Sequence, residues 1–433
     1  MSALAAIRDG FLVDRRVLRE GPLARALDAL NFAGEETRLV GGAVRDLALG
    51  LPVGDFDLAT TALPDIVMSR ARAAGFGVAP TGLKHGTLTL IVDGLPIETT
   101  TLRWDVDTDG RHATVRFGRD FAADAMRRDF TINALSLGAD GALYDYTEGL
   151  ADLAARRVRF IGDADKRIAE DYLRILRFFR FSARYGEGAL DAEGFAAAIA
   201  GRDGLGRLSR ERVRAELLKL LAAPRAGPIT TICCDAGLLT PLLTLAPDPA
   251  RLRNVAAIEA ARGCAPDAIL RLAALGVRIV EDAERLRDRL RLSNAEAERL
   301  AAAATLLPSL HGVSAPPSLG HLRTLLFEHG RAAAQDALTL AHAESAAPQD
   351  DAAFISAWRF LTDTPQPQLP FTGADIVARG VAQGQGVGAI LKRLQALWIR
   401  AGFPKEPEAL ARLLDEALAE PIERGASRLD TDR

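Results

Sequence analysis

Long apolar runs and cysteine are both scarce in this sequence, and each scarcity excludes a class of protein. No apolar run reaches the about 18 residues that suggest a membrane-spanning helix, so we expect none. The first residues lack the charged start, apolar stretch and cleavage site of a secretory signal, which makes the cytoplasm the expected location. Three cysteines lack metal-ligand spacing, and we interpret them as small buried residues in a reducing compartment: Cys233, Cys234 and Cys264.

A strong excess of charge of one sign is also missing. The net charge of −3 over 433 residues gives no overall signature of nucleic-acid binding. The charge is nevertheless uneven, because the segment Ala151–Arg225 holds 16 Lys or Arg against 11 Asp or Glu, a local net charge of +5. A basic face in this segment could hold a polyanion.

The length and the 48% of apolar residues predict two to four domains. In the first third, "TRLVGG" and "TLTLIVDGLPIETTTL" predict strands, the second of them a hairpin that turns at Asp93-Gly94. "LPDIVMSRARAAG" predicts a helix. After about residue 150, helical spacing of Ala, Leu, Arg and Glu predicts a mostly helical remainder, with breaks near residues 222–228, 308–318 and 363–370.

Two aspartates lie close together in "VGDFDLAT". Asp55 and Asp57 are two positions apart on a predicted strand, so their side chains point to the same face. Adjacent carboxylates repel each other unless a cation lies between them, and Mg²⁺ prefers oxygen ligands. Glu98 lies on another predicted strand, which could run beside the first and supply a third carboxylate. Alone, an Asp-x-Asp pair is more often a solvated turn, and that alternative stays open.

Two glycines follow the strand predicted in "TRLV". A strand-to-helix turn without side chains at Gly41 and Gly42 lets backbone N–H groups approach a phosphate, and Arg45 in the next helical turn can add a cation. The sequence contains no P-loop motif. A structural turn beside a surface arginine is the alternative. Phosphate contacts together with a carboxylate-held metal pair favour nucleotidyl or phosphoryl transfer by a two-metal mechanism.

A charged stripe occurs in "EDYLRILRFFR". On a helix, charged residues that step by three positions lie near one face, here Asp171, Arg174, Arg177 and Arg180. A solvated stripe on an amphipathic helix would look the same.

Four segments in order resemble the polymerase-β-like nucleotidyltransferase superfamily, and within it the class II (bacterial-type) tRNA CCA-adding enzymes and poly(A) polymerases. They are "LVGGAVRD", "DFDLAT", "RRDFTINAL" and "EDYLRILRFFRF". With "PTGLKHGTLTL" between them, the resemblance covers about residues 35–185, and residues 371–394 resemble a weaker C-terminal signature. It implies an α+β fold, with a mixed-sheet catalytic head (1–150), a helical neck and RNA-binding region (151–240) and a helical body and tail (241–433).

The resemblance also implies roles for individual residues. Asp55 and Asp57 would hold Mg²⁺, with Glu98 as a third catalytic carboxylate. Asp129 and Asn133 would brace their segment, and Glu170 would orient the base-reading pair, Asp171 and Arg174. The nucleotide would be contacted by Gly41, Gly42, Arg45, Arg128, Asp171, Arg174, Arg177 and Arg180.

The predicted activity is addition of the 3′-terminal CCA to tRNA from CTP and ATP without a nucleic-acid template, by two-metal attack of the tRNA 3′-hydroxyl on the α-phosphate. The partners are therefore tRNA, CTP and ATP, and no membrane. A helix near residues 165–185 would close the nucleotide pocket, and residues 102–118 would form a loop over the site in which His112 contacts RNA or the loop itself. The alternatives are a poly(A) polymerase or terminal-A-adding enzyme and, from a different class, a non-catalytic RNA-binding helical scaffold.

Overall fold

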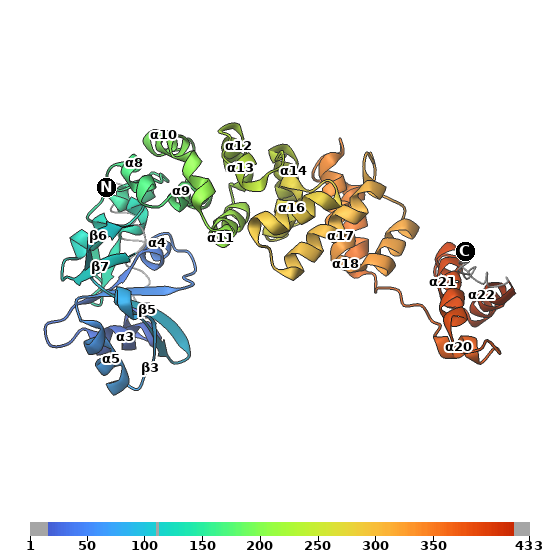
Figure 1. The fold of residues 1–433 in the computed structure, drawn as a ribbon, viewed down its shortest axis with the longest axis horizontal. Coiled ribbons are helices and arrows are strands. Elements are labelled where there is room, and N and C mark those ends of the chain that lie inside the picture. The colour runs from blue at the N-terminus through green and yellow to red at the C-terminus, as the bar shows by residue number, and fades with distance from the viewer. Residues whose placement is uncertain (1–15, 110–111, 420–433) are drawn as a thin grey trace, which may run out of the picture. The chain divides into compact units, whose positions relative to one another are not determined.

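The computed structural model of this protein describes residues 16–109 and 112–419 (Figure 1). The chain forms two compact units. The first unit extends to Pro247 and includes Arg289–Arg291, and the second contains Asp248–Asp288 and the residues from Leu292 onward. The predicted boundaries at residues 150 and 240 stay predictions. Within the described ranges, no helix is both long and apolar enough to cross a membrane.

A seven-stranded mixed sheet forms the centre of the head. Its strand order is β3-β4-β5-β2-β1-β8-β9, in which β2 and β5 are parallel and the other neighbours are antiparallel. The strands are β1 (Thr37–Val40), β2 (Phe56–Thr60), β3 (Gly77–Gly82), β4 (Thr87–Val92), β5 (Leu95–Thr101), β8 (Ser136–Gly138) and β9 (Leu143–Tyr144). The mixed sheet followed by helices confirms the predicted α+β class.

The β4–β5 hairpin forms where its alternating sequence predicts it. Leu88, Leu90 and Val92 are completely buried, while the residues between them point to the other face. The turn residues Asp93 and Gly94 both have positive φ, 52° and 82°, as the twist of a two-residue hairpin turn requires. The hairpin fixes β5 beside β2, and the register pairs Asp57 with Glu98.

Short helices surround the sheet, and Figure 1 shows α3 and α5 at the same end of the first unit as β3. The helices of the head are α2 (Arg16–Arg19), α3 (Pro22–Leu30), α4 (Gly42–Ala48), α5 (Pro64–Ala73) and α6 (Phe121–Met126), with the 3₁₀ turns η2 (Leu83–His85) and η3 (Thr131–Asn133). Residues 102–118, predicted as a loop, contain instead a two-stranded antiparallel ribbon of β6 (Arg103–Asp109) and β7 (His112–Phe117). The side chain of His112 lies outside the described part of the structure.

The predicted neck helix near residues 165–185 is two helices. They are α8 (Ala164–Glu170) and α9 (Leu173–Tyr185), and Asp171 between them has extended backbone angles (φ −156°, ψ 105°). The Asp171 carboxylate accepts a hydrogen bond from the Leu173 N–H (3.1 Å), so a short polar side chain satisfies the start of α9 locally. The prediction that one helix carries all four charged residues was therefore wrong for Asp171, which lies between the two helices. Arg174, Arg177 and Arg180 do lie on one helix.

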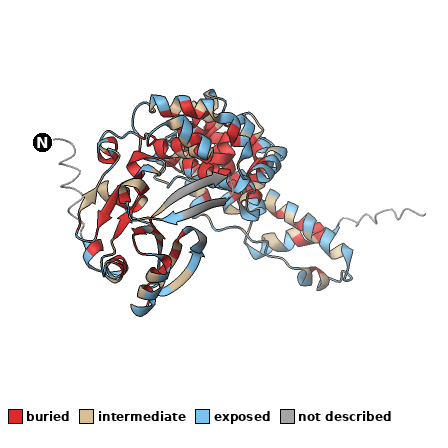
Figure 2. Cartoon of the chain, turned by 60° about the vertical axis from the view of Figure 1, so that its left-hand side comes forward, coloured by how far each residue is buried: buried red, intermediate tan, exposed pale blue. Residues whose placement is uncertain are grey.

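Aromatic packing joins the segment "RRDFTINAL" to α9. The Phe130 ring lies 4.8 Å from Phe160 and 5.3 Å from Phe181, measured between centroids, and Phe160 stacks on Phe178 at 5.5 Å. Phe130 and Phe178 are completely buried. Figure 2 shows buried residues on the inward sides of sheet and helices and exposed residues on the outward sides. The contacts of Phe130 with Phe160 and Phe181 fix the charged residues of "RRDFTINAL" relative to those of α9.

The chain after the head is helical, as predicted. The other helices of the first unit are α7 (Gly149–Ala154), α10 (Ala192–Ala200), η4 (Arg202–Arg207), α11 (Arg210–Leu221), α12 (Ala226–Asp235) and α13 (Thr240–Leu243). The later helices are α14 (Pro249–Ala261), α15 (Ala268–Gly276), α16 (Val280–Leu290), α17 (Asn294–Leu310), α18 (Leu319–Glu344), α19 (Ala352–Asp363), α20 (Gly373–Val377), α21 (Gln385–Arg400) and α22 (Pro407–Ala419). Each of the three predicted breaks contains a gap between helices, although α12 begins inside the first, at Ala226, and α17 extends into the second, to Leu310.

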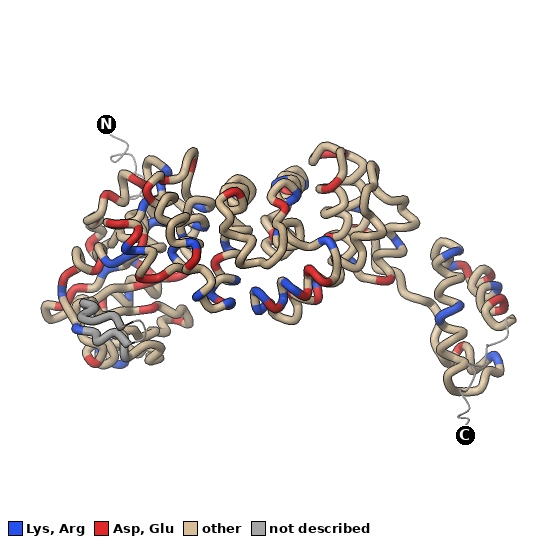
Figure 3. The backbone as a smooth tube through the Cα atoms, turned by 45° about the horizontal axis from the view of Figure 1, so that its top comes forward, with Lys and Arg blue, Asp and Glu red and all other residues tan. Residues whose placement is uncertain are grey.

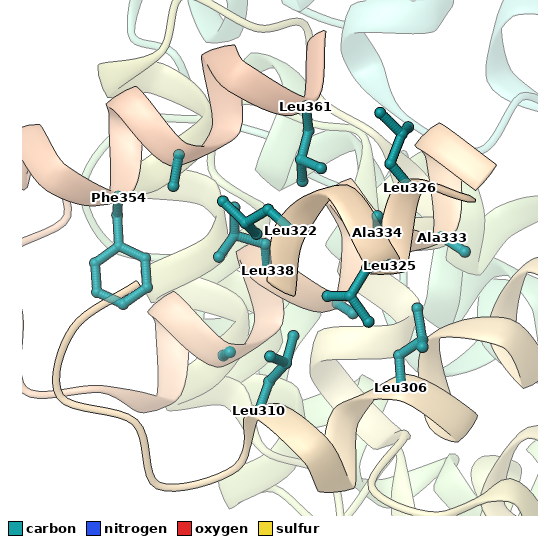
Figure 4. Packing of buried hydrophobic residues seen from close by; sticks show 13 residues of the cluster. Leu306, Leu310, Leu322, Leu325, Leu326, Ala333, Ala334, Leu338, Phe354 and Leu361 are labelled. Atoms are coloured by element: carbon teal, nitrogen blue, oxygen red, sulfur yellow. The ribbon is translucent and has the colours of Figure 1, made fainter. Parts of the chain in front are cut away.

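The second unit has its own apolar core. Leu306 and Leu310 of α17 meet Leu322 and Leu338 of α18 and Phe354 of α19, as the close view in Figure 4 shows. Cys233 in the first unit is buried, whereas Cys234 and Cys264 are only partly buried, and all three are free. Burial raises the pKa of the Cys233 thiol, which keeps it protonated and unreactive.

Candidate active site

Two clefts in the first unit meet at a shared wall of four residues. We call the first the glycine cleft, a space of about 600 Å³ lined by Gly41 and Gly42 together with residues of α9 and α11. We call the second the carboxylate cleft, a space of about 430 Å³ lined by Glu98, Asp171 and Arg174. The residues that line both clefts are Asp57, Arg128, Asp129 and Arg177.

The glycine turn requires glycine at its first position. Gly41 has φ of 72°, which an L side chain rarely adopts, and its N–H donates to the Leu135 carbonyl (3.1 Å). A Cβ atom at Gly41 would lie 3.0 Å from the guanidinium of Arg128. The turn therefore brings bare backbone to the edge of the cleft beside a cation.

Arg45 lines the glycine cleft but is nearly buried. Its guanidinium forms an ion pair with Asp46 (2.9 Å), donates to Tyr185 Oη (2.6 Å) and hydrogen-bonds Asn133. The alternative of a surface arginine is therefore wrong, because Arg45 is a buried cation whose orientation three partners fix.

Arg128 is held by a buried carboxylate. Asp124 accepts from both Nε (3.0 Å) and Nη2 (2.9 Å) of Arg128, and it also accepts from Arg127. Burial acts to raise the pKa of Asp124, but the charges and hydrogen bonds of Arg128 and Arg127 outweigh it and lower that pKa overall. Asp124 therefore stays ionised, and its hydrogen bonds orient the Arg128 guanidinium at the shared wall of the two clefts.

Three carboxylates lie close enough for the charges of Glu98 and Asp55 to act on Asp57, and Arg128 compensates them only in part. The pKa of Asp57 is raised, first by its partial removal from water and then by the charges of Glu98 and Asp55, while Arg128 opposes the rise. Asp55 precedes β2 and lines neither cleft, so the strand predicted for both aspartates holds only Asp57. Within the described ranges, no three His, Cys, Asp or Glu side chains are already arranged around a metal position.

The two predicted base-reading residues line the carboxylate cleft, and each has its own partner. Asp171 pairs with Arg212 of α11 (2.6 Å). Arg174 pairs with Glu170 and donates to the Arg167 carbonyl (2.6 Å). The predicted contact between Glu170 and this pair therefore exists through Arg174.

The two later arginines of α9 are held by acids from other segments. Arg177 pairs with Asp129 (2.6 Å), and Arg180 lies 2.8 Å from Glu216 of α11. Asp129 also accepts a hydrogen bond from the Asn133 amide (3.1 Å), which agrees with the bracing predicted for both. Glu216 belongs to no motif recognised in the sequence.

The structure thus brings most predicted site residues to the two clefts. The glycine cleft receives Gly41, Gly42, Arg45, Asp57, Arg128, Arg177 and Arg180, and the carboxylate cleft receives Asp57, Glu98, Arg128, Asp171, Arg174 and Arg177. The sequence reading missed Arg184 and Lys219, which also line the glycine cleft. Arg184 follows Arg180 by one helical turn and could have been found by extending the stripe, whereas Lys219 has no comparable signal.

Comparison with known proteins decides the family. A sequence family described as the poly(A) polymerase head domain matches residues 37–159, which include the glycine turn, the three carboxylates and Arg128. The mitochondrial CCA tRNA nucleotidyltransferase 1 of Danio rerio is 34% identical over 400 residues, covering 88% of each chain. This chain belongs to the CCA-adding enzyme and poly(A) polymerase family. It is therefore a nucleotidyltransferase, as the sequence predicted.

Bacterial members of this family are also similar. The CCA-adding enzyme of Geobacillus thermodenitrificans is 41% identical over 231 residues, covering 53% of this chain and 56% of the relative. The crystal structure of the Bacillus stearothermophilus CCA-adding enzyme in complex with CTP superposes with a TM-score of 0.71 at 27% identity, covering 92% of this chain and 98% of that one. The Thermotoga maritima CCA-adding enzyme, with a TM-score of 0.67 at 19% identity, shares the fold.

Proposed function

We propose that this chain completes the 3′ end of tRNA by adding CCA from CTP and ATP without a nucleic-acid template. The observation that carries the proposal is the meeting of the two clefts at Asp57. One cleft offers cations and bare backbone to a triphosphate, and the other offers a carboxylate and a guanidinium to a base. Curated relatives of similar length are named for this activity.

The charges of the clefts orient the nucleotide. The base lies between Asp171 and Arg174 in the carboxylate cleft, and the phosphates extend past Asp57 toward Gly41, Gly42 and Arg45. Asp124 and Asp129 hold Arg128 and Arg177 in the shared wall, so these cations are already in place when the nucleotide enters. Preorganised charges of this kind stabilise the transition state without a further cost of reorientation.

The base-reading pair favours cytosine and adenine. Both bases present an amino donor beside a ring-nitrogen acceptor, which matches the acceptor of Asp171 and the donor of Arg174. Uracil and guanine present a carbonyl beside an N–H, so they would leave buried groups unpaired at about 1–3 kcal/mol each. A protein surface can thereby select C and A.

A divalent cation fits the acidic side of the shared wall. The repulsion among Asp57, Glu98 and Asp55 is the condition that a bound cation relieves, and Mg²⁺ is commonly held by one or two carboxylates together with substrate phosphates. Asp55 and Asp57 would hold it, with Glu98 beside them. When bound, such ions supply Lewis-acid activation of the attacking hydroxyl and stabilisation of the leaving pyrophosphate.

The decisive experiment uses tRNA that lacks its 3′ end. The protein is incubated with this tRNA and each nucleoside triphosphate in turn, and the products are sized. Incorporation of two C residues and then one A supports the proposal. Incorporation of A alone, once or repeatedly, would instead favour a terminal-A-adding enzyme or a poly(A) polymerase, and no incorporation would favour an RNA-binding scaffold. The helices after the head are proposed to hold tRNA by its shape and phosphates.

Gly41→Ala tests the glycine turn. We expect the unfolding free energy to fall by about 1–2 kcal/mol because alanine is strained at this φ, and CTP incorporation to fall further because the new methyl group displaces Arg128. Gly50→Ala is the matched control, since Gly50 has a similar φ of 65° and open space around its Cβ position. Thermal unfolding and incorporation rates are measured for both. Equal losses of activity in the two variants would contradict a role for the turn.

Arg212→Gln tests the ion pair that holds Asp171. Both side chains are partly exposed, so the pair is worth less than about 1 kcal/mol, and we expect two- to fivefold weaker discrimination of CTP against UTP. The kcat for CTP should change little, and Arg212→Lys should restore most of the discrimination. The control is Arg202→Gln, which removes an exposed charge outside both clefts. An equal slowing of CTP and UTP would show that Arg212 does not act through base selection.

A further inference from the structure

The cations of the glycine cleft fall into two groups. Arg45, Arg128, Arg177 and Arg180 each lie within ion-pair distance of a carboxylate, as described above. Arg184 and Lys219 also line the cleft, but neither forms an ion pair with a carboxylate in the part of the chain that the structure describes. Both residues are exposed to solvent. Their charges are therefore the ones not yet compensated by the protein.

These two cations come from different helices that are fixed against each other. Arg184 lies in the last turn of α9, and Lys219 in the last turn of α11. The backbone N–H of Arg225, just beyond α11, donates to the carbonyl of Ala183 (3.1 Å), which ties the end of α11 to the turn that carries Arg184. The backbone segments that carry the two charges are thus joined at one corner of the cleft.

The position of this corner relative to the base follows from the lining of the clefts. Asp171 and Arg174 line only the carboxylate cleft, Asp57 lines both clefts, and Arg184 and Lys219 line only the glycine cleft. On α11, Arg212 pairs with Asp171 while Lys219 lies seven residues later, about 10 Å further along the helix axis. A nucleotide whose base is at Asp171 and whose α-phosphate is near Asp57 would therefore direct its terminal phosphates toward Lys219.

The surrounding charge favours an anion at this corner. Arg180 lies in the same cleft, and its pKa is lowered, first by burial and then also by the nearby charges of Arg177 and Arg45, although Glu216 opposes this. Cations that crowd together in a partly buried space are stabilised by a bound polyanion. Figure 3 shows Lys and Arg interleaved with Asp and Glu along the chain.

We propose that Lys219 and Arg184 form a subsite for the β- and γ-phosphates of the incoming nucleotide, and for the pyrophosphate that leaves. This subsite rests on the proposed function and extends it to two residues outside the sequence motifs. Lys219 is a flexible point charge suited to a terminal phosphate, and the Arg184 guanidinium can donate two hydrogen bonds to one phosphate group.

Equilibrium dissociation constants of CTP, CMP and inorganic pyrophosphate test the subsite in the full-length protein. In Lys219→Gln, we expect the dissociation constants of CTP and pyrophosphate to rise about tenfold, because one charge-assisted hydrogen bond is lost. The dissociation constant of CMP, which lacks the β- and γ-phosphates, should stay within twofold. Lys219→Arg should keep most of the affinity, and the double variant Lys219→Gln with Arg184→Gln should lose more than either single variant. Arg202→Gln, with the same loss of net charge, should bind all three ligands normally.

The possible results separate this proposal from the proposed function. Equal weakening of CMP and CTP, or no weakening of either, would overturn the subsite, because a structural role or no role would then explain the data. Wild-type protein that binds CTP but does not extend tRNA would contradict the proposed function and still allow the subsite to be judged from binding alone. If the wild-type protein bound none of the three ligands, both the subsite and the proposed function would be overturned.

Discussion

Replacing Asp57 by Asn is expected to lower nucleotide incorporation by about a thousandfold or more, without lowering the stability of the metal-free protein. The loss of activity follows because Asp57 lines both clefts, at the point where the α-phosphate and its metal ion are proposed to lie. We expect no loss of stability because the pKa of Asp57 is raised in the folded protein. A raised pKa means that burial and the neighbouring carboxylates disfavour the charged form in the folded protein. Asparagine removes that charge.

The sign of the pH dependence gives an independent check. In the metal-free protein, the unfavourable contribution of ionised Asp57 is present above its raised pKa and disappears as the pH falls below the pKa of the unfolded chain. The thermal midpoint of Asp57→Asn should therefore equal or exceed that of the wild type at neutral pH, and the two should converge in acid. Asp28→Asn, an exposed aspartate in α3 outside both clefts, is the control.

Mg²⁺ separates the catalytic explanation from a structural one. With CTP present, Mg²⁺ should raise the thermal midpoint of the wild type and of Asp28→Asn, and should have a smaller effect on Asp57→Asn. Near-normal turnover of Asp57→Asn at saturating Mg²⁺ would contradict the assignment of Asp57. A large loss of stability in this variant would show that Asp57 supports the fold.

Local patterns were sufficient to predict several elements of the head. The alternation in "TLTLIV", the Asp93-Gly94 turn and the strand before Gly41 depend on neighbouring residues, and each forms as predicted. The pairing of Asp57 with Glu98 was anticipated because each lies on a short predicted strand, although only the register of β2 and β5 establishes it.

The rest of the site depends on packing between distant segments. The break at Asp171 arises because its side chain satisfies the start of α9, an option that helical spacing does not reveal. From α11, which packs on α9 and carries no recognised motif, Lys219 lines the glycine cleft, while Arg212 and Glu216 pair with the cleft residues Asp171 and Arg180. The sequence left open whether Arg45 contacts phosphate or is a surface cation, and only the fold shows that Asn133 and Tyr185 enclose it. Such contacts join residues about 40 to 140 positions apart.

Replacing Asp171 by Asn should reduce the preference for CTP over UTP by about ten- to a hundredfold or more, with a smaller change in the rate for CTP. Asparagine keeps an oxygen that can accept from the Leu173 N–H, so the start of α9 is retained. It removes the negative charge that repels the uracil carbonyl, and its amide can donate to that carbonyl. Asp171→Ala should show the same loss of preference together with a lower thermal midpoint, since it also removes the acceptor of the Leu173 N–H.

Arg174→Ala completes the test, because both correct bases offer the same ring-nitrogen acceptor. We expect it to weaken CTP and ATP by similar factors. Single-nucleotide incorporation onto tRNA lacking its 3′ end is measured with CTP, ATP, UTP and GTP for each variant, and Glu193→Gln, outside both clefts, controls for the loss of an exposed carboxylate. If Asp171→Asn slows all four nucleotides by one common factor, Asp171 serves only to support the junction between α8 and α9. Selection of the base would then require residues other than this pair.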